Sequence, residues 1–270
     1  MIKHTLALIF CLVLLLNNSC SNKPHGLRVA ASAVPHAEML EFIESEMEAQ
    51  GFPLEIIVTD DYNTPNRALA SKEIDANFFQ HAPFLDAQIE QFHYPIESIA
   101  QIEIEPMGLY SKKLSALSQL KTGAVVALPN DPTNEARALL MLQNQGWIEL
   151  DNPANRQATP INIVKNPKDL KFLEIDAAML PRTLEDADLA VINTNYALAA
   201  GFNPLSDALA LEDAESPYAN ILVIRQGDES RSDIQALKAA LTSAKMKDFI
   251  LSRYRGAVLP AFCTEGSKSR

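Results

Sequence analysis

Apolar residues along the chain alternate between short continuous runs and the wider spacing of an amphipathic helix. Near the start, the runs LRVAAS (27–32) and LEIIVTD (54–60) predict strands, and the helical spacing between them predicts a helix over 35–51. The opening pattern is therefore β-α-β. Further strands are predicted at 98–111, 123–129, 162–166, 171–175, 188–193 and 219–226, and a last helix at about 234–252.

This repeated alternation predicts an α/β fold whose mostly parallel sheet is covered by helices on both faces. Proline and glycine interrupt the apolar pattern at 105–113, and a proline leads into the strand predicted at 219–226. These two interruptions predict two segments that cross between two lobes. We expect a ligand to bind in the cleft between the lobes. The predicted boundaries are 27–108 and 218–262 for lobe 1 and 109–217 for lobe 2.

The stretch ANFFQHAPFL (76–85) fits neither an apolar run nor strict alternation. Pro83 excludes a long helix or a central strand that runs through it. We therefore expect a turn that gathers aromatic rings. The simpler interpretation is a set of core aromatic residues around a buried histidine.

The N-terminus has the order of a secretory signal: a lysine, an apolar run over 6–16, and then small polar residues. The apolar run is shorter than the roughly 20 residues that span a bilayer. Residues 1–19 are therefore predicted to be a signal peptide, 20–26 a tether, and 263–270 a disordered tail.

The signal ends at Cys20, which resembles the lipidated cysteine of a bacterial lipoprotein, although Asn17 stands where leucine is usual. The alternative is an ordinary signal peptide with an unmodified Cys20. The other cysteines, Cys11 and Cys263, lie in the signal and the tail, so no disulfide framework is expected.

Composition narrows the function further. The 270 residues are 47% hydrophobic, as in a folded globular protein, and carry a net charge of −11 without a basic block. Nucleic acid is therefore not an expected partner. His36 and Glu38 open a zinc-deaminase pattern, but its P-C-x-x-C partner is absent, as are the common hydrolase and phosphate-binding motifs. We do not expect an enzyme.

Several motifs occur together in order: PHAE (35–38), DANFFQHAPFL (75–85), PMGLYSKK (106–113), PNDPTNEARALLML (129–142) and ESPYAN (215–220). They resemble the NlpA/MetQ family of substrate-binding lipoproteins over about 27–262. The resemblance implies a two-lobed periplasmic-binding-protein fold that captures L-methionine or a close analogue for an ABC importer. It also implies permease and ATPase partners, a lipid anchor in a bacterial membrane, and a position facing the periplasm or the exterior.

Under this resemblance Phe79, His81, Phe84 and Tyr62 would surround the methionine thioether, and no cofactor or metal is expected. Sulfur near aromatic ring edges contributes roughly 0.3 to 1.5 kcal/mol per contact. Phe84 stands where many family members have tyrosine, so any bond made by that hydroxyl is lost here.

The polar end of methionine needs a cation and amide acceptors. Arg137 lies in a helix that Asp131 is expected to cap. Its guanidinium group could bind a carboxylate in a bidentate manner, or Arg137 could be a solvated surface arginine. The resemblance favours ligand binding by Arg137, Asn193 and Asn220. Turn capping is the alternative for these asparagines, and it is the preferred role for Asn195.

Two other ligands stay open. The first is D-methionine or a methionine dipeptide. The second is a metal ion held by His36, His81, His93 and nearby carboxylates, although histidines this far apart in the chain are a weak signal.

Overall fold

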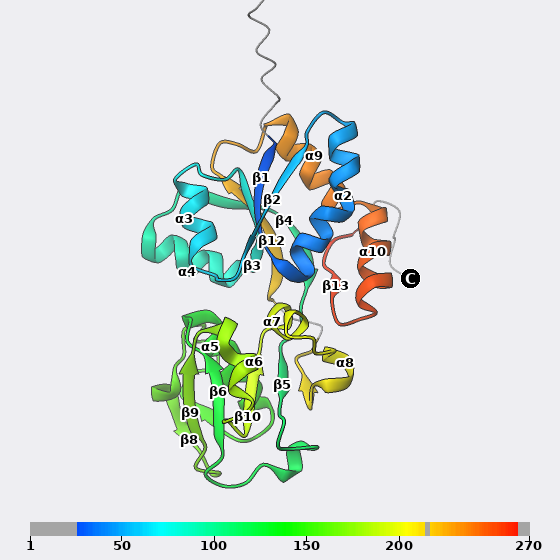
Figure 1. Ribbon diagram of the computed structural model, residues 1–270. Helices are drawn as coiled ribbons and strands as arrows, with labels where there is room; N and C mark the ends of the chain where they lie inside the picture. Colours follow the sequence, from blue (N-terminus) through cyan, green and yellow to red (C-terminus); the bar gives the residue numbers. More distant parts are fainter. Residues whose placement is uncertain (1–25, 214–216, 264–270) are drawn as a thin grey trace, which may run out of the picture.

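The computed structural model describes residues 26–213 and 217–263; the predicted signal peptide, Cys20 and nearly all of the predicted tail lie outside them. Two β-sheets form two lobes, one above the other in Figure 1. The two-lobed α/β fold expected from the sequence is confirmed.

Lobe 1 contains a six-stranded sheet in the order β13-β4-β12-β3-β1-β2. The strands β1, β2 and β3 run parallel, whereas β12 runs antiparallel to both β3 and β4. The strands are β1 (Leu27–Ser32), β2 (Leu54–Thr59), β3 (Ala76–His81), β4 (Ile96–Ile104), β12 (Ala219–Arg225) and β13 (Leu259–Pro260).

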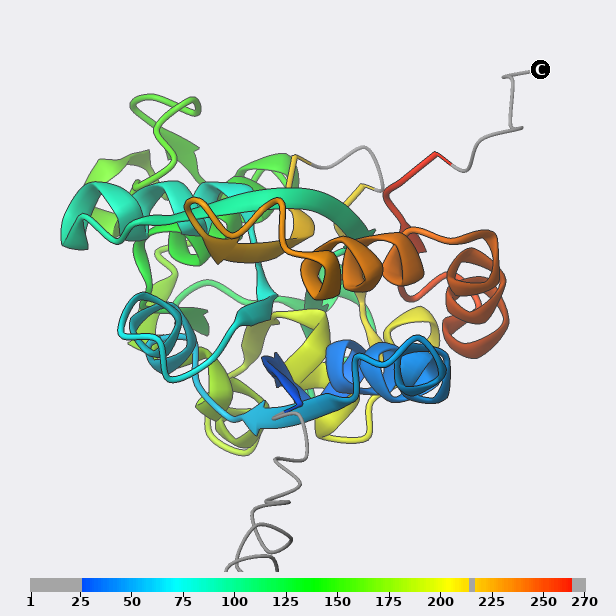
Figure 2. The ribbon, with the colours of Figure 1, turned by 90° about the horizontal axis from the view of Figure 1, so that it is seen from above.

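Helices cover both faces of this sheet. One face packs against α2, α9 and α10, and the other against α3 and α4, which lie on opposite sides in Figures 1 and 2. A short irregular segment, η1 (Ala33–Ala37), joins β1 to α2. The helices are α2 (Glu38–Ala49), α3 (Thr64–Ala70), α4 (Ala82–Phe92), α9 (Ser232–Leu241) and α10 (Ala244–Tyr254).

Lobe 2 contains a five-stranded sheet in the order β11-β5-β10-β6-β9 and a separate pair, β7 with β8. Helix α5 packs on one face of the five-stranded sheet, and α6 and α7 pack on the other. The strands are β5 (Gly108–Tyr110), β6 (Val125–Pro129), β7 (Glu149–Leu150), β8 (Ile163–Lys165), β9 (Lys171–Ile175), β10 (Leu189–Ile192) and β11 (Ala210–Leu211). The helices are η2 (Leu117–Gln119), α5 (Pro132–Asn144), η3 (Pro160–Asn162), η4 (Ala177–Met179), α6 (Leu180–Thr183), α7 (Thr194–Ala199) and α8 (Pro204–Asp207).

The chain crosses between the lobes twice, from β4 to β5 and from β11 to β12. In both sheets, the strands on either side of these crossings pair antiparallel with their neighbours, so the sheets are mixed. The prediction of a mostly parallel sheet is therefore wrong, because a chain that leaves a sheet and returns from the other lobe can re-enter it in the opposite direction. The residues at which each lobe ends stay a prediction.

Two local predictions are also wrong. Residues 76–81 form a fully buried strand between β12 and β1, and Pro83 falls in the first turn of the helix that follows, where proline costs no hydrogen bond. The helix predicted at about 234–252 is two helices. The break lies at Ser243, whose side chain accepts a hydrogen bond from the backbone N–H of Met246 and so starts α10.

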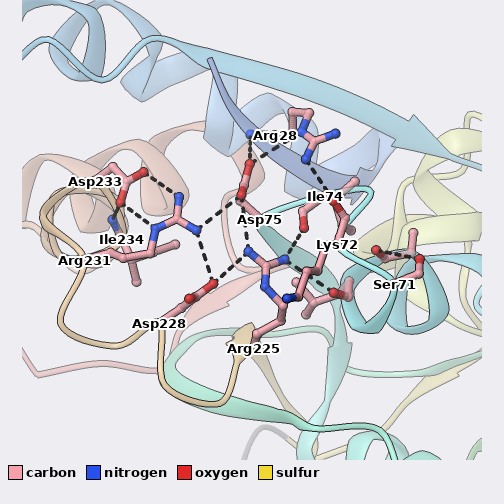
Figure 3. Close-up of polar contacts among 12 residues, drawn as sticks. Arg28, Ser71, Lys72, Ile74, Asp75, Arg225, Asp228, Arg231, Asp233 and Ile234 are labelled. Carbon is pink, nitrogen blue, oxygen red and sulfur yellow. Dashed lines mark hydrogen bonds and ion pairs between the residues drawn. The ribbon is translucent and has the colours of Figure 1, made fainter. Parts of the chain in front are cut away.

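The end of the lobe 1 sheet that lies away from lobe 2 is held by an ion-pair network (Figure 3). Asp75, just before β3, accepts hydrogen bonds from the backbone N–H of Arg28 at 3.1 Å and from the guanidinium groups of Arg225 and Arg231 at 3.3 Å each. Arg225 also pairs with Asp228 at 2.7 Å. The network joins the ends of β1, β3 and β12.

Candidate ligand-binding site

A small cavity lies between the lobes, with walls from both of them. Lobe 1 contributes walls from η1, β3, α4 and the start of β12, and lobe 2 contributes walls from α5 and α7. All seven residues predicted to bind the ligand line this one cavity: Tyr62, Phe79, His81, Phe84, Arg137, Asn193 and Asn220.

Three aromatic rings form one wall of the cavity. The ring centroids of Tyr62 and Phe79, and of Tyr62 and Phe84, are 5.9 Å apart, and those of Phe79 and Phe84 are 6.0 Å apart. Phe84 meets both other rings edge to face. Such a cluster offers ring edges and faces to an apolar, polarizable group.

Strand β3 fixes this wall because a buried amide network holds its polar side chains. The side chains of Asn66 and Gln80 exchange hydrogen bonds of 2.8 and 2.6 Å, and Asn77 donates to Asn66 at 3.0 Å. Buried amides are stable only when paired in this way. The network explains how a fully buried strand can contain asparagine and glutamine.

His81 connects this strand to the facing lobe. Its Nδ1 accepts the backbone N–H of Phe84 at 3.1 Å, and its Nε2 lies 3.1 Å from Oδ1 of Asn134 in α5. Because Nδ1 accepts, we assign the proton of the neutral ring to Nε2, which donates to Asn134. Burial and the charge of Arg137 lower the pKa of His81 to about 3, so the imidazole is neutral at physiological pH.

Arg137 lies in α5, whose first turn is capped by Asp131, as predicted. The side chain is only 4% exposed, so it is not a solvated surface arginine. Its Nε donates to the carboxylate of Glu212 at 3.0 and 3.1 Å, and its Nη2 donates to Glu212 and to the backbone carbonyl of Glu105. The fork expected for a ligand carboxylate is thus occupied by Glu212, and the guanidinium lies 4.4 Å over the ring of Tyr218.

Asparagines complete the contact between lobes. Asn193 donates to Oδ1 of Asn134 at 2.8 Å, while its own Oδ1 is buried and has no hydrogen-bond partner among the described residues. Tyr62 donates to Oδ1 of Asn195 at 2.7 Å. Asn195 was expected to cap a turn, but its side chain instead joins lobe 2 to lobe 1.

The first crossing brings a carboxylate to the cavity. Glu105 lies beside His36 and Glu103, with His36 Nε2 at 3.3 Å from Glu105 and 3.2 Å from Glu103. Asn220 donates to Glu105 at 3.2 Å. Burial raises the pKa of both glutamates to about 8, and their mutual repulsion adds to the rise for Glu105. Burial also lowers the pKa of His36.

Six further cavity residues were not predicted to bind ligand: His36, Gln80, Glu105, Asn134, Thr194 and Asn195. The sequence suggests a role for His36 only as a metal ligand. Gln80 lies in the motif DANFFQHAPFL and Asn134 in the motif PNDPTNEARALLML, and both motifs support the family resemblance. The place of these residues in the two motifs is the sequence signal for a role in ligand binding. Glu105 follows a strand and precedes a proline, a position with no local sign of burial.

The histidine set proposed for a metal receptor is not brought together. His36 and His81 line the cavity, but His93 is exposed at the far end of α4. The 11 residues of that helix place it about 16 Å from His81.

The family model for NlpA lipoprotein matches residues 27–262. The chain belongs to the NlpA lipoprotein family. Among the proteins of this family, the methionine-binding lipoprotein MetQ of Bacillus subtilis (strain 168) is 39% identical over 249 residues, covering 90% of this chain and 91% of that protein. The D-methionine-binding lipoprotein MetQ of Escherichia coli (strain K12) is 36% identical over 239 residues, covering 87% and 88%.

A solved structure extends the comparison. A nutrient-binding protein from Burkholderia cenocepacia, determined bound to methionine, is 44% identical and superposes with a TM-score of 0.84, covering 87% of this chain and all of that chain. Within residues 26–213 and 217–263, no helix of this NlpA-family chain has the length and apolar character needed to cross a membrane.

Proposed function

We propose that this NlpA-family protein is an extracytoplasmic receptor that captures methionine, or a close analogue, and delivers it to an ABC importer. The main support is a single cavity that combines an aromatic wall with an arginine, a carboxylate and several amides. A free amino acid with an apolar side chain needs these groups together. The related structure bound to methionine supports the same ligand.

The methionine side chain would lie against Tyr62, Phe79 and Phe84. These rings are about 6 Å apart and belong to lobe 1. Contacts between sulfur and ring edges, at roughly 0.3 to 1.5 kcal/mol each, favour a thioether over an aliphatic chain of similar length.

The ligand carboxylate would lie near Arg137. Because Nε and Nη2 are bonded to Glu212 and Glu105, the nitrogen that remains is Nη1, which makes no hydrogen bond to the described residues. A contact through Nη1 is single rather than forked. Glu212 would then act as a positioning residue that holds the guanidinium at the edge of the cavity.

The ligand ammonium would be accepted by Glu105 and by Oδ1 of Asn193. Both groups line the cavity, and Oδ1 of Asn193 is buried without a partner among the described residues. An unpaired buried acceptor costs about 1 to 3 kcal/mol, and a bound ammonium would recover that cost.

Capture would proceed by closure of the lobes. Direct bonds already join them: Tyr62 to Asn195, His81 to Asn134, and the hydroxyl of Tyr196 to the backbone carbonyl of Asp60 at 3.2 Å. A ligand that contacts both walls adds to these bonds and so favours the closed form. The importer's permease and ATPase would be the partners of this closed form.

The signal sequence supports export, with 1–19 removed and Cys20 lipidated in a bacterial membrane. Replacing Cys20 with serine should then release the protein from the membrane fraction. A wild-type chain that is already soluble and unacylated would contradict the anchor without affecting the ligand proposal.

The ligand is tested by releasing it from purified protein through partial unfolding and identifying it by mass spectrometry. Calorimetric titration with L-methionine, D-methionine, a methionine dipeptide and leucine follows. We expect one equivalent of methionine to bind and leucine to bind more weakly. Recovery of a different ligand class, with no heat from any methionine compound, would overturn the proposal.

A further inference from the structure

Three ionisable side chains converge beside the cavity. Glu103 and Glu105 are two residues apart at the end of β4, so both project to the same side of the extended chain, where His36 of η1 meets them. Their exposed fractions are 1% for His36, 0% for Glu103 and 5% for Glu105. Three such groups are rarely buried together without a compensating charge.

Most polar atoms of this cluster have no partner. Both nitrogens of His36 and both oxygens of Glu103 make no well-aligned hydrogen bond to the described residues, and the weak contacts of Glu103 with Asn220 and Glu105 do not offset its burial. Oxygens of Glu103 and Glu105 lie 3.2 and 3.3 Å from Nε2 of His36, but the angles do not suit a hydrogen bond. Arg137 is a nearby cation, but its guanidinium group already donates hydrogen bonds to Glu212.

The spacing matches ligands around a small cation. Bonds of about 2.0 to 2.1 Å arranged tetrahedrally place neighbouring ligand atoms about 3.3 Å apart. The two distances from His36 Nε2 agree with that spacing, and all three residues offer ligand atoms within 4.8 Å of one another. We propose that His36, Glu103 and Glu105 form a site for one first-row divalent cation, with zinc as the ion that fits best.

The chemistry of the donors supports this choice. An imidazole and two carboxylates suit zinc or manganese, and a divalent ion would neutralise the two carboxylates. Magnesium retains several waters, for which a buried cluster has little room. His36 and Glu105 also line the cavity, so an open position on the ion would face it. The zinc proposal rests on its own geometry, but it shares Glu105 with the proposed ammonium contact, so bound zinc and bound methionine would compete for this carboxylate.

The test uses the mature chain treated with a chelator and then titrated calorimetrically with zinc, manganese or magnesium chloride. We expect one equivalent of zinc to bind, with magnesium undetectable at the same concentrations. Glu103→Gln keeps the shape of the side chain and should weaken zinc binding at least about 10-fold. Cobalt(II) should give the intense visible absorption of a four-coordinate ion in the wild type only.

The matched controls are Glu44→Gln and His93→Asn, both at exposed positions. His93 has a φ of 56°, which asparagine tolerates. Thermal unfolding must show that each variant is folded. Zinc binding that is equal in wild type and Glu103→Gln, or no zinc binding by the folded wild type, would overturn the site and show that protons alone neutralise the cluster.

Discussion

The ionisable groups at the two ends of the lobe 1 sheet differ in whether hydrogen bonds offset the cost of their burial. At the end away from lobe 2, burial acts to raise the pKa of Asp75, but hydrogen bonds from Arg28 and Arg231 lower it more, so its pKa is below the ordinary value. At the cavity end, burial raises the pKa of Glu103 and Glu105 to about 8, and hydrogen bonds do not compensate. The first end satisfies its charges, and the second does not.

The difference indicates what each end contributes. Paired charges at the network of Figure 3 fix strand ends and need no ligand. Unsatisfied groups at the cavity cost stability, and a protein keeps such a cost where a ligand can recover it. Substitutions at the cavity end should therefore change binding, and substitutions at the network end should change stability.

The largest effect is expected for Arg137→Ala. Loss of one member of a desolvated charge pair typically costs about 2 to 5 kcal/mol, which is about 30-fold to several thousand-fold in methionine affinity. Stability should fall as well, because Glu212 would lose its hydrogen bonds to the guanidinium. Calorimetry and urea unfolding measure the two effects.

The double variant Arg137→Ala/Glu212→Ala separates those effects. It should recover stability relative to Arg137→Ala, because the carboxylate that faced the guanidinium is removed together with it, while methionine affinity stays low. An affinity for Arg137→Ala within about threefold of wild type would exclude Arg137 from the ligand site.

The aromatic wall should give the next largest effect. Phe79→Ala removes a ring that faces Tyr62 and Phe84, and should weaken methionine binding by about 1 to 3 kcal/mol. Phe249→Ala is the matched control in α10, where the ring stacks on Phe42 at 4.3 Å. It should lower stability and leave affinity unchanged. Equal binding losses in both variants would show that Phe79 only supports the fold.

The contribution of His81 to the stability of the ligand-free protein should be sensitive to acid. Its pKa is about 3 in the folded state and 6.5 unfolded, so the unfolded state binds more protons between these values. The contribution is therefore complete above pH 6.5, and between pH 7.5 and 5.0 its loss reaches up to about 2 kcal/mol. Glu103 and Glu105 act in the opposite direction, because their pKa of about 8 makes the folded state bind more protons than the unfolded state between 4.5 and about 8.

Urea unfolding at the two pH values gives the net change in stability, to which His36, Glu103 and Glu105 contribute in wild type and variant alike. The difference between wild type and His81→Gln isolates the loss that is due to His81. An identical pH dependence in wild type and variant would mean that His81 can be protonated in the folded state.

At the network end, Asp75→Asn should cost about 1 to 2 kcal/mol of stability, because three donors lose a charged acceptor that is mostly buried. Methionine affinity should change less than twofold. In chelator-treated protein, Glu103→Gln should not lower stability as Asp75→Asn does. Stability should stay equal or rise, because the substitution removes a buried carboxyl group whose charge is not compensated. Equal losses from both substitutions would remove the distinction between the two ends.

The apolar pattern predicted most strands correctly because each is a short, nearly continuous apolar run. It failed at β3, where Asn77 and Gln80 interrupt the run and are satisfied by Asn66, 11 and 14 residues earlier in the chain. Partners at such distances leave no local pattern. The break before α10 did have a local sign, the capping residue Ser243.

The site was predicted from family motifs rather than from periodicity. Those motifs placed Arg137 at the cavity but not its pairing with Glu212, which lies 75 residues away. The convergence of His36 with Glu103 and Glu105 was equally hidden, because it depends on how β4 ends beside η1. Sequence motifs predicted residues that line the cavity, and only the packing of distant segments gave their partners.

The smallest effect is expected for Phe84→Tyr. Phe84 is 4% exposed and lines the cavity, so the new hydroxyl can reach space that a ligand or water occupies. We expect methionine affinity within about threefold of wild type, a difference of ~0.7 kcal/mol. Val223→Thr puts a hydroxyl into the packed core of the same lobe and should cost about 1 to 3 kcal/mol of stability, because the hydroxyl has no partner there. If Phe84→Tyr lost as much stability as Val223→Thr, the wall around Phe84 would be packed core and not the lining of a ligand site.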